Sequence, residues 1–316
     1  MKMDNKKPIL LAGSHRSGTT WVGKIISSSR SVGYLMEPFN KSHPRPGLVD
    51  SEFDNWFQYV NHENGPLYYE QIKRMLKFQY DLGAGVSAIR SGKDFLKLVR
   101  DYYRCMQFRH SNARPLIKEP TAIFMAPWLA ENFDSDVIIL IRHPAAFISS
   151  LKILQWRHPF AQFLQQPALM RDYLSPFEKE ITQYAIVEQS LIDQAILLWK
   201  IVHHTIRLHQ QKYKEWVYLR HEDISLDPMK GFEKLFLRLG IDIDEGVRKC
   251  IVKYSSNINP VDSTTPDLLP QREKAVKRNS QANIYNWKKR LTENEINYIR
   301  EHVEDISKDF YVDSEW

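Results

Sequence analysis

An eight-residue loop at positions 13–20, Gly-Ser-His-Arg-Ser-Gly-Thr-Thr, constrains the fold of this chain more than any other segment. It follows a short apolar run at 8–12 and precedes apolar residues at helical spacing between 21 and 26. Such an order predicts a strand, a glycine-bounded loop and a helix. The successive N–H groups of the loop and the positive end of the helix would then face an anion. We therefore expect an anion-binding loop here rather than an ordinary glycine turn.

The same alternation continues along the chain. Further apolar runs predict strands at 32–36, 114–118, 137–141 and 216–219, and helices are expected after Pro120 and Pro144 and near 67–80, 93–108, 184–211, 229–239 and 292–307. The run at 137–141, with four β-branched residues, is typical of a central parallel strand buried on both faces. Together these patterns favour a single doubly wound, P-loop-like α/β domain over residues 1–316, with a parallel sheet flanked by helices.

Three segments do not fit this alternation. Residues 40–110 and 156–182 contain no pattern typical of core strands, and we interpret both as helical or loop insertions. Residues 255–285 are polar and lack periodicity, which predicts a loop or lid near the C-terminal end.

The loop at 13–20 differs from that of a kinase. It matches the Walker A sequence, G-x-x-x-x-G-K-[ST], at both glycines and at Thr20. Thr19, however, stands where the lysine that reaches the β- and γ-phosphates belongs. Arg16 can supply a cation from inside the loop, and both threonines add hydroxyl donors. The sequence thus predicts an anion site without the lysine that a nucleoside triphosphate requires.

A second cation follows the predicted central strand. In P-loop NTPases a later strand ends in an acidic residue that helps to hold Mg²⁺, whereas the strand at 137–141 is followed by Arg142. The carboxyl end of a parallel strand points at the ligand crevice, where a guanidinium suits a phosphate. Two cationic sites without an obvious metal site predict one nucleotide with phosphate at two separate positions. An ion pair at the strand end is the alternative for Arg142.

Composition narrows the functional classes further. The chain has 44 Lys and Arg against 38 Asp and Glu, a formal net charge of +6, which favours anionic ligands without being a signature of nucleic-acid binding. The two cysteines, Cys105 and Cys250, form neither a disulfide framework nor a zinc-ligand pattern. No apolar run is long enough for a signal peptide or a membrane span. We expect a cytoplasmic protein without a metal site.

The loop and Arg142 together resemble a known family. The segment 14–21, Ser-His-Arg-Ser-Gly-Thr-Thr-Trp, resembles the 5′-phosphosulfate loop of sulfotransferases that use 3′-phosphoadenosine 5′-phosphosulfate (PAPS). Arg142, followed eight residues later by Ser150, is similar to the 3′-phosphate site of that family. Weaker similarities lie at 218–224 and at 287–288, so the resemblance reaches both ends of the chain.

The resemblance implies a role for each residue of these motifs. The 5′-phosphosulfate would be held by Arg16, Ser17, Gly18, Thr19 and Thr20, and the 3′-phosphate by Arg142 and Ser150. Trp21 would pack near the adenine, although an aromatic residue at the start of a helix more often belongs to the core. The family's C-terminal Arg-Lys-Gly element is not matched. Lys277 and Arg278 lie near the right place but lack the glycine, and we assign no ligand contact to them.

The catalytic base should be a residue other than histidine. Cytosolic hormone and phenol sulfotransferases carry Lys-Thr-His at the third core strand, whereas this chain has Lys-Glu-Pro at 118–120. Glu37, followed by Pro38, resembles the glutamate base of carbohydrate sulfotransferases; a solvated turn residue is the alternative. We expect Pro38 to keep Glu37 extended, with its carboxylate in the crevice. Lys118 and Arg16 would neutralise charge on the leaving oxygen, and Glu119 is the rival base.

These inferences favour an enzyme, a PAPS-dependent sulfotransferase that acts on a hydroxyl of a carbohydrate or glycolipid. The unmatched segments 40–110 and 156–182 are expected to face that acceptor. Five aromatic residues of the first segment could stack on sugar rings or form core, namely Trp56, Phe57, Tyr59, Tyr68 and Tyr69. His15, inside the anion loop, could also touch the anion. A P-loop-like nucleotide or small-molecule kinase and a nucleotide-binding module without turnover are the alternatives.

Overall fold

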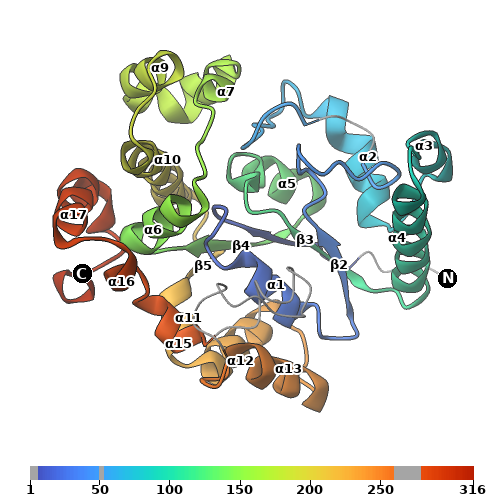
Figure 1. Cartoon of the computed structure of the whole chain (residues 1–316). Coiled ribbons are helices and arrows are strands. Elements are labelled where there is room, and N and C mark those ends of the chain that lie inside the picture. Colours follow the sequence, from blue (N-terminus) through green and yellow to red (C-terminus); the bar gives the residue numbers. More distant parts are fainter. Residues whose placement is uncertain (1–5, 50–52, 260–278) are drawn as a thin grey trace.

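A five-stranded parallel sheet forms the centre of the molecule, as predicted (Figure 1). The computed structural model describes residues 6–49, 53–259 and 279–316. The strand order is β2-β3-β1-β4-β5, with all neighbours parallel. The strands are β1 (Ile9–Ala12), β2 (Val32–Met36), β3 (Arg114–Lys118), β4 (Asp136–Ile141) and β5 (Val217–Arg220). The predicted single α/β domain with a parallel sheet is therefore confirmed.

Helices cover both faces of this sheet because both faces of its central strands are apolar. Successive residues of β1 alternate between two clusters: Leu10 belongs to one and Leu11 to the other. The helices of the first face are α5 (Ala126–Phe133), α6 (Pro144–Leu154), α10 (Leu191–Lys212) and α17 (Glu293–Ser307). Those of the second are α1 (Thr19–Ile26), α12 (Pro228–Leu239) and α13 (Glu245–Ser255). Figure 1 shows the two groups above and below the sheet.

The two predicted insertions are largely helical. Residues 40–110 contain α2 (Pro66–Leu76), α3 (Leu82–Ser87) and α4 (Gly92–His110), beside the β2 edge of the sheet in Figure 1. The second insertion contains α7 (Ala161–Leu164), α8 (Pro167–Leu169), a π-helical turn (Met170–Leu174), a 3₁₀ turn (Ser175–Phe177) and the start of α9 (Glu178–Ile186).

The aperiodic segment near the C-terminal end is not entirely a loop. Within 255–285, residues 260–278 lie outside the described ranges, but Ser280–Ile284 forms the short helix α15. Asn279 caps it by accepting a hydrogen bond from the Ala282 N–H at 3.0 Å. Five residues are too few to give a visible helical period, which is why the sequence predicts a loop there. The short helices α11 (His221–Leu226) and α16 (Trp287–Arg290) escape prediction for the same reason.

Among the helices described, none combines the length and the apolar character that a bilayer crossing requires.

Candidate active site

Polar residues follow every strand of the sheet at one edge. The anion loop follows β1, Glu37 follows β2, Lys118 ends β3, Arg142 follows β4 and His221 follows β5. Because the strands are parallel, their carboxyl ends meet at the same edge. All five contribute to the lining of one cavity, which we call the donor cavity. The sheet thus brings together residues that lie far apart in the sequence.

Both glycines of the anion loop occupy positions where a side chain would collide. Gly18 has φ +98°, and a Cβ there would lie 2.3 Å from Cδ2 of His221. A Cβ on Gly13 would lie 2.5 Å from the Leu140 carbonyl oxygen. Ser17 is buried and its hydroxyl donates to the Ser14 carbonyl at 2.6 Å, so its side chain holds the loop together. The glycines allow the loop to approach β4 and α11 closely.

The remaining loop residues face the donor cavity. Arg16, with φ +66°, donates from Nε to the Ser150 hydroxyl of α6 at 3.0 Å, which joins two motifs that the sequence treats as separate phosphate sites. Thr19 and Thr20 begin α1 and line the cavity. Trp21 also lines it, but only 6% of its surface is exposed. Its ring lies 5.5 Å from that of His221 and 5.2 Å from that of Phe232, so the alternative of core packing is present, and the contact with adenine stays a prediction.

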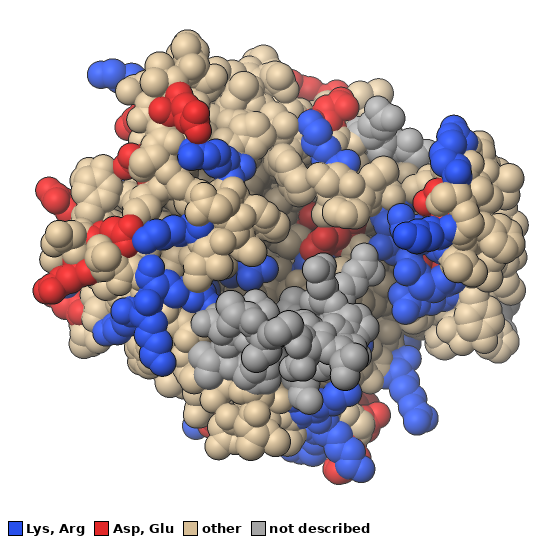
Figure 2. Space-filling view, viewed as in Figure 1, with Lys and Arg blue, Asp and Glu red and all other residues tan. Residues whose placement is uncertain are grey.

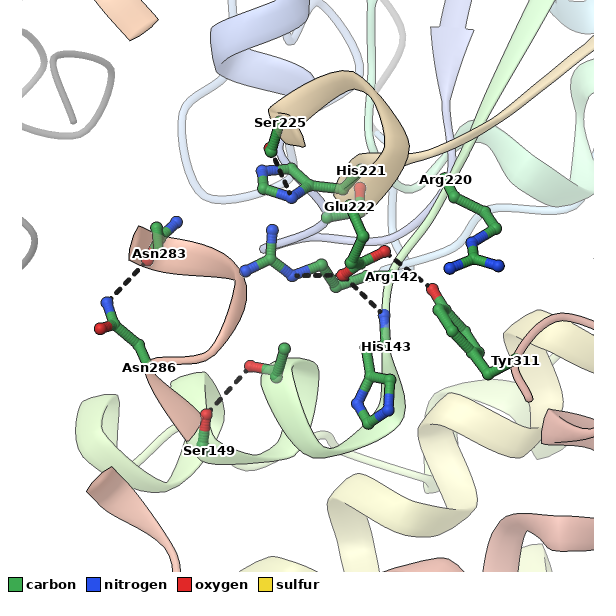
Figure 3. A network of polar contacts seen from close by, with 12 residues as sticks. Arg142, His143, Ser149, Arg220, His221, Glu222, Ser225, Asn283, Asn286 and Tyr311 are labelled. Carbon is green, nitrogen blue, oxygen red and sulfur yellow. Dashed lines mark hydrogen bonds and ion pairs between the residues drawn. The ribbon is translucent and has the colours of Figure 1, made fainter. Parts of the chain in front are cut away.

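Arg142 lines the donor cavity and is almost completely buried. Its Nε is 3.5 Å from Oε1 of Glu222, on α11 (Figure 3). Burial lowers the pKa of the Arg142 guanidinium, and Glu222 counteracts this. The predicted alternative of a strand-end ion pair is therefore present, and it coexists with a position in the cavity wall.

Glu222 is a residue that sequence reasoning missed. Its carboxylate accepts hydrogen bonds from the His143 backbone N–H at 3.2 Å and from the Tyr311 hydroxyl at 3.0 Å (Figure 3). Burial and this carboxylate raise the pKa of Tyr311 well above its ordinary value. His143 is itself buried, stacked 5.1 Å from the Trp287 ring. The network fixes the backbone at the end of β4 and so the position of Arg142.

Glu37 and Lys118 form an ion pair, and both line the donor cavity. The Lys118 side chain is 1% exposed and that of Glu37 28% exposed. Asn40 donates to the second carboxylate oxygen of Glu37 at 3.0 Å. The expectation that Pro38 keeps Glu37 extended is wrong: its φ is +48°, in the left-handed region. The Glu37 N–H donates to the Lys118 carbonyl at 2.8 Å, and this bond to β3 holds the turn against the local preference.

Glu119 is held differently from Glu37. Its carboxylate accepts a hydrogen bond from the Phe39 N–H at 3.0 Å and another from the Thr121 hydroxyl at 3.1 Å, and the residue is buried. Burial, followed by the nearby Glu37 carboxylate, raises the pKa of Glu119 to about 7. Since Phe39 lies two residues beyond Glu37, Glu119 fixes the turn that carries Glu37.

A second cavity, of about 500 Å³, adjoins the donor cavity; we call it the acceptor cavity. The two share His15, Glu37, Pro120 and Trp156 in their walls. The acceptor cavity also contains amide and hydroxyl side chains, those of Asn40, Ser42, Thr121, Gln155 and Gln194. Its size is typical of small-molecule sites, and Glu37 lies where both cavities meet.

Of the five aromatic residues singled out in the first insertion, Trp56 lines the acceptor cavity. Phe57 and Tyr59 belong to the core, and Tyr68 and Tyr69 pack against it. His15 lies with its ring 5.7 Å from those of Phe57 and Phe147 and 5.8 Å from that of Trp156. Burial lowers the pKa of His15 to about 4, so its imidazole is neutral near pH 7 and adds no cation to the loop.

Several further donor-cavity residues come from the C-terminal part of the chain. They are Tyr254, Ser280, Asn283 and Arg290. Arg290 lies close enough to Arg142 to contribute to lowering its pKa. It ends α16, two residues after the Trp-Lys pair at 287–288, a position that could have suggested it. Lys277 and Arg278 lie outside the described residues. No group of His, Cys, Asp or Glu suited to a metal ion occurs within the described ranges.

Comparison with known proteins gives one family. A model of the sulfotransferase family matches residues 8–245. No curated protein gives a significant match to the sequence. Similar solved structures include a sulfotransferase domain from the curacin biosynthetic pathway, at 14% identity and TM-score 0.48, covering 95% of this chain and 98% of that one. Sulfotransferase STF9 from Mycobacterium avium is similar at 13% identity and TM-score 0.47, covering 98% of this chain and 78% of that one. Mouse sulfotransferase SULT7A1 complexed with PAP is similar at 14% identity and TM-score 0.46, covering 99% of this chain and 89% of that one.

Proposed function

Because the chain belongs to the sulfotransferase family, we propose that it transfers the sulfuryl group of PAPS to a hydroxyl of a carbohydrate or glycolipid. The observation that carries the proposal is the position of Glu37 and Lys118, paired at the junction of the donor and acceptor cavities. A transfer enzyme needs its base and its charge-neutralising group at such a junction, where donor and acceptor meet.

The donor cavity suits an adenosine with phosphate at two positions. Gly13 and Gly18 let the loop pack closely against β4 and α11, and its backbone N–H groups at the N-terminus of α1 would face the phosphate. Arg16, Thr19 and Thr20 would hold the 5′-phosphosulfate, with Ser17 holding the loop. On this proposal Arg142 and Ser150 would bind the 3′-phosphate and Trp21 would contact the adenine. The hydrogen bond from Arg16 to Ser150 supports the proposal that both phosphate sites belong to one nucleotide.

In the proposed reaction Glu37 accepts the proton of the acceptor hydroxyl as its oxygen bonds to sulfur. The bond between sulfur and the bridging oxygen breaks, and that oxygen keeps the electron pair. Lys118 and Arg16 stabilise its negative charge. Glu119 has both carboxylate oxygens engaged by Phe39 and Thr121, so we assign it the role of holding the Glu37 turn. No covalent intermediate on the protein is required.

The acceptor cavity favours a carbohydrate. Trp56 and Trp156 offer flat apolar faces to a sugar ring, and Asn40, Gln155 and Gln194 offer amides for its hydroxyl groups. An amphiphilic acceptor such as a glycolipid would also suit its rim, where Trp156 is 49% exposed. The proposal covers both kinds of acceptor.

Calorimetry with 3′,5′-adenosine bisphosphate (PAP), ADP and ATP–Mg²⁺ tests the donor assignment. We expect PAP to bind at least about tenfold more tightly than ADP, because only PAP engages both phosphate sites. Tighter binding of ATP–Mg²⁺ than of PAP would contradict the proposal and favour the kinase alternative.

Transfer from PAPS to a panel of sugars and alkyl glycosides tests catalysis. Glu37→Gln should lower kcat by about 10²- to 10⁴-fold while PAP still binds. Glu119→Gln is the matched control. Its amide oxygen can still accept the Phe39 N–H that holds the Glu37 turn, so this variant should keep most of the activity. If Glu119→Gln abolishes transfer and Glu37→Gln does not, Glu119 is the base. Binding of PAP without transfer to any acceptor would favour a module without turnover.

A further inference from the structure

Helix α4 exposes a stripe of apolar side chains along its outer face. Its members are Phe95, Leu96, Val99, Tyr103 and Met106, each between 45% and 69% exposed. At 100° per residue they cover about 100° of the helix circumference, so they form one continuous strip. These side chains stay exposed in the folded chain, so they add little to its stability. A continuous exposed apolar strip indicates an interaction surface.

The opposite face of α4 fixes the helix on the domain. Asp101 and Cys105 are buried there, and Asp101 pairs with Arg45 at 3.2 Å. Phe108 lies 5.2 Å from the ring of Phe78. The outer stripe is therefore held in place by contacts that do not involve it, and it can be changed without disturbing the core.

One side of the stripe is bordered by basic residues. Lys93, Lys97, Arg100 and Arg104 follow one another at spacings of four, three and four, so they share a strip next to the apolar one. Lys97 lies 3.8 Å from Asp94, and Arg100 pairs with Asp101 at 2.8 Å. Figure 2 shows Lys and Arg gathered at the edge of the molecule where α4 lies in Figure 1.

Helix α3 extends the apolar surface. Leu82 and Val86, four residues apart on α3, are both exposed, and α3 packs against α4. A Cβ on Gly85 would lie 3.1 Å from the Leu98 side chain, which shows how closely the two helices approach. The exposed surface therefore spans two neighbouring helices at one edge of the domain.

We propose that α4 and α3 dock the protein on an anionic lipid membrane. Exposed Phe, Leu and Met side chains next to a row of long cationic side chains are the arrangement that binds the interface between acyl chains and headgroups. Charge favours this partner over a second copy of the chain. A second α4 brings another basic row, and its acidic side chains are Asp94, beside Lys97, and the buried Asp101.

Co-sedimentation of the full chain with vesicles tests this proposal. We compare phosphatidylcholine vesicles with vesicles containing 30 mol% phosphatidylserine, in about 0.1 M and 0.5 M salt. The wild type should bind the anionic vesicles at least about tenfold more tightly, and the higher salt should remove most of that difference.

Two variants on α4 and one matched control separate the contributions. Leu96→Ser/Tyr103→Ser removes apolar side chains, and Lys93→Gln/Arg104→Gln removes two charges of the basic row. Each variant should bind anionic vesicles about tenfold more weakly. The control, Leu237→Ser/Val252→Ser, changes exposed apolar residues on α12 and α13 and should bind like the wild type. Circular dichroism checks that all three fold.

Equal loss in the control, or no preference for anionic vesicles, overturns the proposal. So does a concentration-dependent dimer in light scattering that the α4 apolar variant abolishes while vesicles do not bind, since the surface would then be a contact between copies. PAP binding, measured on the same samples, should be unchanged in every variant, so that failure here is distinct from failure of the proposed function.

Discussion

The donor and acceptor cavities share a wall but are built from different kinds of segment. The donor cavity takes most of its key residues from positions directly after strands, such as the anion loop, Lys118 and Arg142. The acceptor cavity takes Asn40, Trp56 and Trp156–Pro159 from the two insertions, together with residues at the start of α10. The sheet thus fixes the part of the site that we propose binds the nucleotide, and the insertions form most of the part that we propose binds the acceptor.

The two cavities also differ in the polar side chains that line them. In the donor cavity the cations Lys118 and Arg142 are almost fully buried, each paired with a carboxylate. The acceptor cavity adds neutral amide and hydroxyl side chains to its lining, those of Asn40, Ser42, Thr121, Gln155 and Gln194. Substitutions of buried charged residues and of the anion loop should therefore have larger effects than substitution of the half-buried Trp56, which the following predictions test in descending order.

Arg142→Ala should produce the largest effect. Removing a buried cation from the proposed 3′-phosphate site should weaken PAP binding by about 100-fold or more, with a much smaller change for AMP, which has no 3′-phosphate. Calorimetry with both ligands measures the difference. Because the variant leaves the Glu222 carboxylate without its cation, Arg142→Ala/Glu222→Gln serves as the second variant. Equal losses for PAP and AMP would contradict a separate 3′-phosphate site.

Glu119→Gln should change how stability depends on pH. Burial raises the pKa of Glu119 to about 7, above its ordinary value of 4.5, so the folded protein retains a proton that the unfolded chain loses. The wild type should accordingly lose up to about 3 kcal/mol of unfolding free energy relative to the variant as pH rises from about 4.5 to above 7. Urea unfolding of both proteins at several pH values measures this, and parallel pH profiles would show that Glu119 is not buried as a neutral acid.

Gly18→Ala should destabilise the anion loop. The new Cβ meets the His221 ring at 2.3 Å and also forces a side chain to adopt φ +98°. We expect a loss of about 2 kcal/mol in unfolding free energy, together with weaker PAP binding. Gly240→Ala is the matched control: its φ is +63° with no atom within 4 Å of the new Cβ, so it has the backbone strain without the collision. Equal losses of unfolding free energy in the two variants would show that backbone strain, and not the collision with His221, causes the destabilisation.

Trp56→Ala should have the smallest effect and affect only the acceptor side. Loss of one aromatic wall should raise KM for a carbohydrate acceptor by about tenfold, with little change in kcat. The affinity for PAP should be unchanged, because Trp56 lines the acceptor cavity. A fall in PAP affinity as large as that in acceptor affinity would show that the two cavities do not act separately.

Much of the donor cavity could be predicted from the sequence for a simple geometric reason. Short apolar runs identify the strands, and a parallel sheet necessarily gathers their carboxyl ends at one edge. The anion loop, Lys118 and Arg142 could therefore be placed together before any contact was known. The aromatic residues of the first insertion could not be sorted in this way, because composition does not distinguish Trp56 in a cavity wall from Phe57 in the core.

Contacts between distant segments were decided only by the tertiary structure. The His143 backbone and Glu222 are 79 residues apart, and Glu119 reaches Phe39 across 80 residues. The proline that follows Glu37 favours an extended backbone there. The hydrogen bond from the Glu37 N–H to the Lys118 carbonyl nevertheless holds its φ angle in the left-handed region. The sequence by itself determined the strands, the loop and the residues that end them, since those depend on neighbours along the chain. Packing brings residues together regardless of their separation in sequence. It therefore decides how Glu37 and Glu119 are held, which residue pairs with Arg142 and where Arg290 lies.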